Sequence, residues 1–263
     1  MPASQFRLLL RSYKPAPKHW HPLCLSALVF ICAALAQPAS ADPRLRWDEQ
    51  APAFLSAVGK LTVPGIRIES GYSRHVREDC SGTLLASRDN RPPRHVLTAW
   101  HCIEHYKDLS KNIIFTLPDG RQRKARPVED GGGMRADWAL LTLDSPLPLS
   151  WAADVHSRGG VSRQSELPQW RLTMAGFSGD AGLGADGEAL TYHSHCGVIE
   201  VTDDHVNTNC LAYKGASGGA VFSVDEAGEA TLRGVISAGD GQAMSAYMPL
   251  SRIRGRLRSL MSF

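Results

Sequence analysis

The sequence has 263 residues, with 29 Lys and Arg against 26 Asp and Glu and a hydrophobic fraction of 43%. This composition excludes a disordered or collagen-like chain and is typical of a globular protein with an ample core. No apolar run reaches the roughly 18 residues that a membrane-spanning helix needs. The length suits one large domain or two small ones.

The first 41 residues have the three parts of a secretory signal peptide. Arg7, Arg11, Lys14 and Lys18 form a positive head without an acidic residue, and an apolar run follows over 23–36. Small residues then precede the predicted cleavage point after Ala41. An N-terminal anchor or a buried helix is the alternative, but the run is short for an anchor. We therefore expect a cleaved leader and a secreted or periplasmic protein with no stable membrane span.

Removal of this leader changes both the charge and the cysteine count. The remaining 222 residues carry 25 basic and 26 acidic side chains, so the basic character of the chain lies in its leader. Nucleic acid is therefore not an expected partner, and the basic stretch 121–126 is interpreted as a solvated strand or loop. Four cysteines remain in an exported chain, which predicts two disulfides.

The mature chain is predicted to be mostly β-structure. Segments rich in Val, Ile, Leu and Thr alternate with turn clusters, which favours a sandwich or barrel over βαβ units. The expected strands are 57–63, 81–86, 95–98, 113–117, 138–143, 171–176, 197–201, 205–210, 220–224, 231–237 and 244–247. The stretch 144–165 has few strand signals and is the expected connection between two β halves.

A short helix is expected at the C-terminal end. Ser251 can cap it, and its apolar side chains recur on one face at Ile253, Leu257, Leu260 and Met261. Arginines alternate along the same segment, and we interpret them as the solvated face of a docked helix rather than as a site for an anionic partner. A glycine inside this helix, Gly255, is expected to weaken it by about 1 kcal/mol relative to alanine.

Three short motifs carry candidate chemistry. LTAWHC at 97–102 places His101 at the end of a strand, beside a cysteine. DWALL at 137–141 places Asp137 at the start of an apolar strand, and GASGGA at 215–220 sets Ser217 among glycines. Each motif alone is common in purely structural roles.

Together and in this order, the three motifs match the parts of a nucleophilic site. A serine hydroxyl becomes a good nucleophile when an imidazole takes its proton, and the imidazole needs a carboxylate that fixes its tautomer. Glycines let backbone N–H groups approach a substrate carbonyl and face the oxyanion that develops. The chain order His, Asp, Ser is that of the chymotrypsin arrangement.

At these motifs the sequence resembles the trypsin-like (chymotrypsin-fold) serine proteases. LTAWHC resembles the family's (L/V)TAAHC, DWALLTLDSPL resembles D(I)ALL(K)L-x-x-P(L), and GASGGA resembles GDSGGP. RGVISAG at 233–239 resembles the family's GVVSWG. The resemblance covers nearly the whole mature chain and implies an all-β fold of two antiparallel six-stranded β-barrels with a C-terminal helix. The implied bounds are about 55–145, about 165–250 and 251–263.

The resemblance also implies roles for individual residues. His101 would be the general base, Asp137 its orienting carboxylate and Ser217 the nucleophile, with oxyanion-hole N–H groups from Gly215 and Ser217. Extended substrate backbone would pair as an added strand with Ser237, Ala238 and Gly239. The implied activity is hydrolysis of peptide bonds in protein or peptide substrates, with no metal or other cofactor.

The cysteines support the same resemblance. CSGTLL at 80–85 resembles the family's C-x-G-(S/T)-L-(I/L), which implies a Cys80–Cys102 disulfide beside His101. Cys196 and Cys210 flank a plausible hairpin, and a bridge between them would brace the segment that leads to Ser217. His193 and His195 raise a zinc alternative, but they lack the paired spacing of structural zinc sites.

The chain departs from trypsin in two places. The residue before Ser217 is Ala216 rather than an acidic residue, and no I-V-G-G-like start appears, so we expect activity without a salt bridge to a freed N-terminus. Six residues before the nucleophile stands Leu211, where trypsin carries an acidic residue. With Ala212 and Ser245, it predicts a neutral or apolar specificity pocket.

Two other functions compete with proteolysis. Family members that have lost a residue of the triad act as binding or regulatory proteins, but this chain retains all three. A serine esterase of the α/β-hydrolase type needs its serine on a strand-to-helix turn, whereas Ser217 stands between predicted β segments. We therefore expect an exported serine endopeptidase.

Overall fold

The computed structural model of the protein describes residues 41–87, 91–107, 110–155 and 171–262. The predicted leader, up to residue 40, and most of the expected connection between the two halves lie outside these ranges. The residues from Pro43 onward form one compact unit, which contains both sheets and the site. Within the described ranges, no helix has the length and apolarity required to cross a membrane.

The first half of this unit is a closed barrel of six antiparallel strands, in the spatial order β2-β3-β4-β7-β6-β5. Leu61, Leu84, Leu97, Phe115 and Leu141 are fully or almost fully buried in its core. The strands are β2 (Val58–Glu69), β3 (Tyr72–Leu85), β4 (His95–Thr98), β5 (Ile113–Thr116), β6 (Gln122–Asp130) and β7 (Ala139–Leu143).

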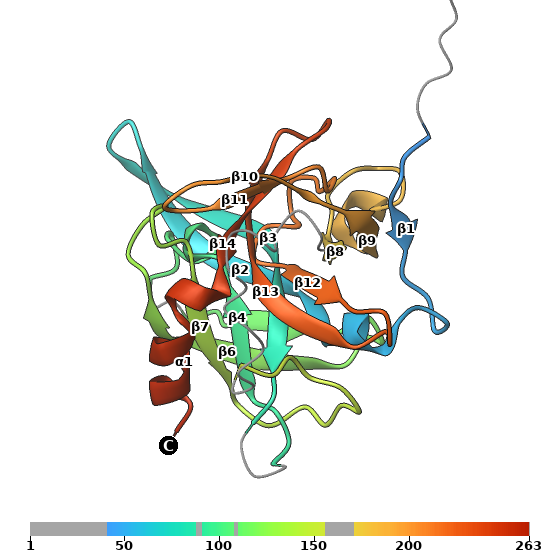
Figure 1. Cartoon of the computed structure of the whole chain (residues 1–263). Coiled ribbons are helices and arrows are strands. Elements are labelled where there is room, and N and C mark those ends of the chain that lie inside the picture. The colour runs from blue at the N-terminus through green and yellow to red at the C-terminus, as the bar shows by residue number, and fades with distance from the viewer. Residues whose placement is uncertain (1–40, 88–90, 108–109, 156–170, 263) are drawn as a thin grey trace, which may run out of the picture. The chain divides into compact units, whose positions relative to one another are not determined.

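The second half is an eight-stranded antiparallel sheet in the order β1-β9-β8-β12-β13-β14-β11-β10. Figure 1 shows this sheet curling beside the barrel. The all-β, chymotrypsin-like class is thereby confirmed, with the detail that the second half is a curled sheet of eight strands where six in a closed barrel were expected. The strands are β1 (Leu45–Arg46), β8 (Leu172–Phe177), β9 (Leu190–Cys196), β10 (Val198–Val201), β11 (Val206–Thr208), β12 (Ala220–Val224), β13 (Ala230–Gly239) and β14 (Ser245–Pro249).

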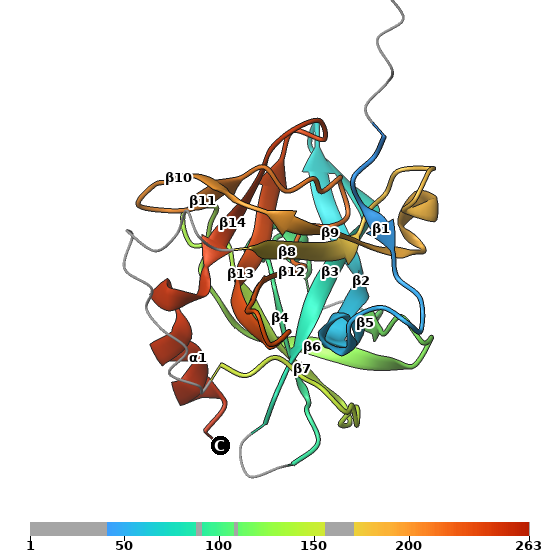
Figure 2. The ribbon, with the colours of Figure 1, turned by 45° about the vertical axis from the view of Figure 1, so that its right-hand side comes forward.

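Every expected strand lies on an observed one, and the strands that the sequence pattern missed are polar or short. β6 has only Ala125 buried, so its alternation carries little apolar signal. β9 is interrupted by His193, Ser194 and His195, and β1 has only two residues. β1 matters for the architecture, because it precedes the barrel in the chain but pairs with β9 of the second sheet (Figure 2).

The helix α1 (Arg254–Leu260) follows a 3-10 turn (Leu250–Arg252) at the C-terminal end. The prediction that Ser251 caps this helix is wrong, because Ser251 lies inside the 3-10 turn and no side chain caps the first turn of α1. Leu257 is fully buried, as the apolar spacing predicted. Arg256 forms an ion pair with Glu129 of β6, so this arginine ties α1 to the barrel.

Three further 3-10 turns complete the described secondary structure, at Ala53–Ala57, Trp100–Cys102 and Ala185–Gly187. The second of them contains His101 and follows directly after the end of β4.

Candidate active site

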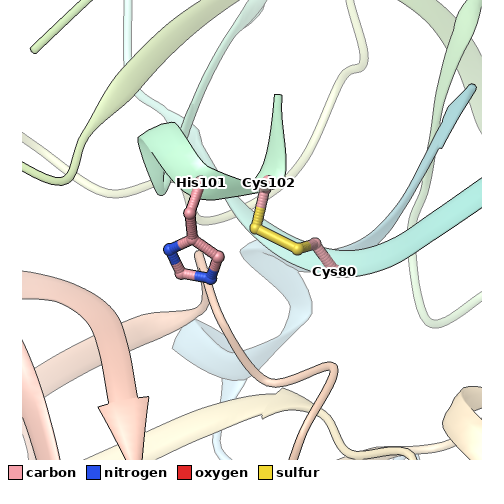
Figure 3. Close-up of side chains that lie close together, drawn as sticks. All are labelled: Cys80, His101 and Cys102. Carbon is pink, nitrogen blue, oxygen red and sulfur yellow. A yellow bond between two sulfur atoms is a disulfide. The ribbon is translucent and has the colours of Figure 1, made fainter. Parts of the chain in front are cut away.

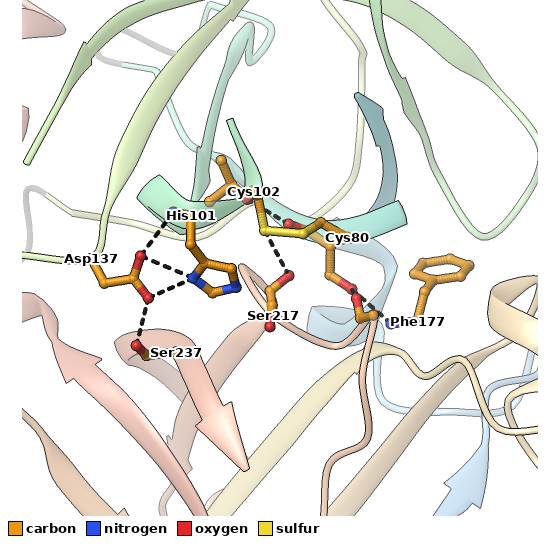
Figure 4. Close-up of a disulfide and its surroundings, with 10 residues drawn as sticks. Cys80, His101, Cys102, Asp137, Phe177, Ser217 and Ser237 are labelled. Atoms are coloured by element: carbon orange, nitrogen blue, oxygen red, sulfur yellow. Dashed lines mark hydrogen bonds and ion pairs between the residues drawn. A yellow bond between two sulfur atoms is a disulfide. The ribbon is translucent and has the colours of Figure 1, made fainter. Parts of the chain in front are cut away.

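The three motif residues come from loops at the ends of strands in both halves. His101 lies in the 3-10 turn after β4, and Asp137 lies just before β7 of the same barrel. Ser217 precedes β12 of the second sheet. In Figure 4 the imidazole of His101 stands between Asp137 and Ser217. Folding therefore brings the three residues together at the junction of the two halves.

The contact between His101 and Asp137 is short and orients the ring. The Nδ1 atom of His101 lies 2.9 Å from Oδ2 and 3.1 Å from Oδ1 of Asp137. The backbone N–H of His101 also donates to Oδ1, at 3.1 Å. Because an ionised carboxylate can only accept, we assign the ring proton to Nδ1, which leaves the lone pair of Nε2 free to accept a proton.

Asp137 is fully buried, so its carboxylate depends on hydrogen bonds for stabilisation. Besides the two groups of His101, the hydroxyl of Ser237 donates to Oδ2 at 2.5 Å. Ser237 stands where the register between β13 and β14 shifts, between Ile236 and Ala238. Such irregularities in a ladder re-aim a side chain near a functional site.

The sequence motif indicates a role for Ser237 in binding substrate backbone, but it gives no sign of the contact with Asp137. The two residues are 100 positions apart, and no local pattern marks a bulge that turns a hydroxyl toward a distant carboxylate.

The loop that carries Ser217 packs tightly against the barrel. Gly218 has φ of +81°, and a Cβ atom there would lie 2.1 Å from Oγ1 of Thr98 and 2.2 Å from the carbonyl oxygen of Ser81. The backbone N–H of Ser81 donates to the carbonyl of Ser217 at 2.8 Å. The hydroxyl of Ser81 donates to the carbonyl of Gly215 at 2.9 Å. Ser81 is thus a second positioning residue that the motifs did not reveal.

The backbone N–H groups around Ser217 divide into two sets. Those of Ala216, Gly218 and Gly219 donate to backbone carbonyls at 2.8–3.0 Å. In the described part of the chain, the N–H groups of Gly215 and Ser217 have no such backbone acceptor. Gly215 and Ser217 are partly exposed, so these two N–H groups are available to donate to an oxygen atom from outside the chain.

Both predicted disulfides are present. Cys80–Cys102 closes a loop of 22 residues and stands beside His101 (Figure 3). By the chain-entropy model, a loop of this length contributes about 3 kcal/mol to stability. Cys196–Cys210 closes the hairpin formed by β10 and β11. The Sγ atom of Cys102 also lies 3.6 Å from the carbonyl oxygen of Ser217, a van der Waals contact because a disulfide sulfur carries no proton.

The disulfides also bear on the zinc alternative. Cys80, His101 and Cys102 lie close together, as do His193 and Cys196, but zinc binds cysteine as a thiolate. The sulfur atoms of both groups are engaged in disulfides, so they do not fit the metal. His193 instead accepts the backbone N–H of Leu211 at its Nδ1 atom, at 2.8 Å.

The residues predicted to bind substrate lie near the same loop. Leu211 and Ala212 are almost fully buried, and the N–H of Ala212 donates to the hydroxyl of Ser245 at 3.1 Å. Gly239 lies close to the same two residues, because a Cβ atom there would lie 3.0 Å from the Ala212 carbonyl oxygen and from Ser245 Oγ. Ala238 is exposed and pairs with Ala246 of β14.

A closed barrel, a curled sheet and a His–Asp pair facing a serine at their junction define the class of chymotrypsin-like folds. The model of the trypsin-like peptidase domain family matches residues 80–231, more than half of the chain, so the chain belongs to this family. A protease-type function follows from this membership. The search of curated proteins finds no match to the chain.

Proposed function

We propose that the protein is a serine endopeptidase in which His101, Asp137 and Ser217 form the catalytic triad. The observation that carries the proposal is the arrangement of the imidazole, with its Nδ1 atom 2.9 Å from a buried carboxylate and Ser217 on its other side (Figure 4). No hydrogen bond joins the Ser217 hydroxyl to the imidazole among the described residues. Such bonds are often long in a free enzyme and shorten when substrate binds.

The first half of the reaction forms an acyl-enzyme. Ser217 Oγ attacks the carbonyl carbon of the peptide bond, and its proton passes to Nε2 of His101. Asp137 stabilises the imidazolium, while the N–H groups of Gly215 and Ser217 donate to the oxyanion. The tetrahedral intermediate then collapses, the C–N bond breaks, and His101 returns the proton to the leaving amine.

In the second half of the reaction, the acyl-enzyme ester is hydrolysed. A water molecule gives a proton to His101 and attacks the acyl carbon, and the same N–H groups stabilise the second oxyanion. The bond to Ser217 Oγ breaks, and the serine takes the proton back from the imidazolium. The products are a carboxylic acid and the regenerated hydroxyl, so no oxidant, reductant or cofactor is required.

Substrate backbone would add to the sheet at Ser237, Ala238 and Gly239. On one side this end of β13 pairs with β14, but its pairing with β12 ends at Val235. An unpaired strand end accepts an extended peptide by β-augmentation. The uncharged side chains of Leu211, Ala212 and Ser245 would surround the substrate residue that precedes the cleaved bond. We therefore propose a preference for neutral, apolar residues at that position.

Export through a cleaved leader is part of the same proposal. The head, apolar run and small residues of 1–41 support it, together with two disulfides that form in an oxidising compartment.

The decisive experiment compares the wild-type protein with Ser217→Ala in labelling by a fluorophosphonate probe and in cleavage of a peptide library. We expect labelling to be lost in the variant and kcat to fall by about five to six orders of magnitude. Ser251→Ala, which changes an exposed serine away from the site, is the matched control and should label as the wild type does.

Two results would contradict the proposal. A folded wild type that does not label would favour a binding or regulatory protein on this fold. Cleavage mainly after Arg, Lys or Glu would refute the neutral pocket while leaving the nucleophile in place.

A further inference from the structure

The segment before the barrel contains a buried cation. The side chain of Arg44 is only 1% exposed, and its two terminal nitrogens donate to the two carboxylate oxygens of Asp180 at 2.8 and 3.0 Å. The guanidinium carbon also lies 4.0 Å from the centre of the Tyr213 ring. A charge as buried as this requires such partners, and the planar guanidinium suits both the carboxylate and the ring.

Arg44 is held in place by the strand that follows it. Leu45 and Arg46 pair with Tyr192 and Thr191 of β9, and the N–H of Trp47 donates to the carbonyl of Leu190 at 2.9 Å. These contacts fix the backbone directly after Arg44, so the guanidinium extends from the edge of the second sheet.

Both groups that Arg44 contacts adjoin the loop before Ser217. Asp180 follows Gly179, whose N–H donates to the carbonyl of Lys214 at 2.6 Å. Tyr213 accepts the N–H of Ala216 at its carbonyl, at 3.0 Å. The guanidinium therefore joins two chain segments, and each segment makes a backbone hydrogen bond to a residue next to Gly215.

The carboxylate of Asp180 is built into its own loop as well. The carboxylate accepts the N–H of Gly184 at 3.2 Å, and the backbone carbonyl of Asp180 accepts the N–H of Asp186 at 2.9 Å. The hydrogen bonds from Arg44 hold the pKa of this carboxyl below its ordinary value, so the pair is charged at neutral pH.

Gly215 needs such support from outside. Its φ is +95°, a conformation that glycine reaches as readily as the ordinary ones, so its own backbone does not favour one orientation of the N–H. The neighbouring contacts must supply that preference. A Cβ atom at Gly215 would lie 2.6 Å from the carbonyl oxygen of Phe177 and 3.3 Å from the nitrogen of Gly179, which shows how closely the Asp180 loop approaches.

We propose that Arg44 is a positioning residue of the active site, which holds the loop 213–215 through Asp180 and Tyr213 so that the Gly215 N–H faces the substrate oxyanion. The inference rests on the proposed function, because it assigns the N–H of Gly215 to the oxyanion hole. The positioning cation is supplied by a side chain of the segment that precedes the barrel.

The test separates this role from a purely structural one. Arg44→Met keeps most of the stem and removes the guanidinium, and Arg46→Met changes the exposed arginine two positions later in β1 as the matched control. The full mature chain of each is measured for fluorophosphonate labelling and for kcat and KM with p-nitrophenyl acetate. Circular dichroism gives the folded fraction and Tm.

We expect kcat and the labelling rate constant of Arg44→Met to fall about tenfold or more per folded molecule, because oxyanion donors act in the transition state. KM should stay within about twofold, and Arg46→Met should match the wild type. Arg44→Lys should recover only part of the rate, since an ammonium cannot hold both carboxylate oxygens and stack on the ring.

If Arg44→Met does not fold, a second variant still tests the inference. Tyr213→Leu removes the ring beneath the guanidinium, leaves the ion pair with Asp180 and retains the backbone carbonyl. It should lower kcat severalfold with little change in KM.

Three results would overturn the inference. In the first, Arg44→Met lowers Tm but leaves kcat per folded molecule unchanged. In the second, Tyr213→Leu has the kcat of the wild type. In both of these cases a labelled wild type leaves the proposed function intact. An unlabelled wild type refutes the proposed function, and this inference with it.

Discussion

Ser237 carries two separate functions in the proposed site, one through its backbone and one through its hydroxyl. The backbone belongs to the strand end that would pair with substrate, while the hydroxyl donates to the buried carboxylate of Asp137 at 2.5 Å. A buried anion with fewer donors is less well stabilised, and hydrogen bonds to charged groups contribute about 1.5–3 kcal/mol. The orientation of His101 therefore depends on a residue from the other half of the molecule.

We predict that Ser237→Ala lowers kcat/KM by about ten- to a hundredfold, as the loss of one charged hydrogen bond implies. The protein should remain folded and KM should change little, because the backbone that would bind substrate is unaltered. Steady-state kinetics on the peptide selected from the library measures the effect. Ser237→Thr retains a hydroxyl and should recover most of the rate; an alanine variant as active as the wild type would refute the role.

The C-terminal helix shows how packing compensates for weak local preference. α1 has only seven residues, contains Gly255 and lacks a side-chain cap. Isolated helices of this length are not stable in water. Leu257 is fully buried and Arg256 pairs with Glu129, so contacts with the barrel hold the helix.

Gly255→Ala is predicted to raise the free energy of unfolding by about 0.5–1 kcal/mol, because alanine loses less backbone freedom in a helix. Among the described residues, no heavy atom outside the adjoining backbone of α1 lies within 4 Å of the position its Cβ would take. Gly218→Ala is the contrasting variant, since its Cβ would lie 2.1 Å from Thr98 Oγ1, and it should destabilise the protein and abolish labelling. Urea denaturation measures both. A destabilised Gly255→Ala would mean that α1 packs differently.

The two halves of the molecule share one site and are joined by more than the site itself. Ser81 of the barrel binds the carbonyls of Gly215 and Ser217 in the second half. β1 adds the segment before the barrel to the edge of the second sheet. The first described residues therefore pair with the second sheet, the next residues form the barrel, and the remaining strands complete the second sheet. This path places the first described residues near the loop before Ser217.

We expect the chain that begins at Asp42 to be active without further trimming. Ala216, the residue before the proposed nucleophile, is buried and offers no carboxylate to a freed amino group. Arg44 acts through its side chain, which is present whatever precedes it. Fluorophosphonate labelling rates of this chain and of one with an added Gly-Ser should agree within about twofold. A protein that stays inert until it is trimmed beyond Asp42 would contradict this expectation.

Much of this architecture is encoded in local patterns. The alternation of apolar residues predicts the strands that have several buried apolar side chains. The motifs around His101, Asp137 and Ser217 predict that the candidate triad comes from three loops. Strand periodicity and short motifs arise from neighbours in the chain, so they can be read without the fold. β6, β9 and β1 escaped because they are polar, interrupted or short.

The support of the site, in contrast, depends on contacts between distant residues. Ser237 meets Asp137 across 100 positions, and Arg44 meets Asp180 across 136. The folded structure is also needed to see that, within the described ranges, the N–H groups of Gly215 and Ser217 have no backbone acceptor. Motifs and their spacing in the sequence identify the candidate catalytic residues. Their orientation is a property of the folded chain, because the burial, the bulge and the ion pair that impose it exist only after the two halves have packed together.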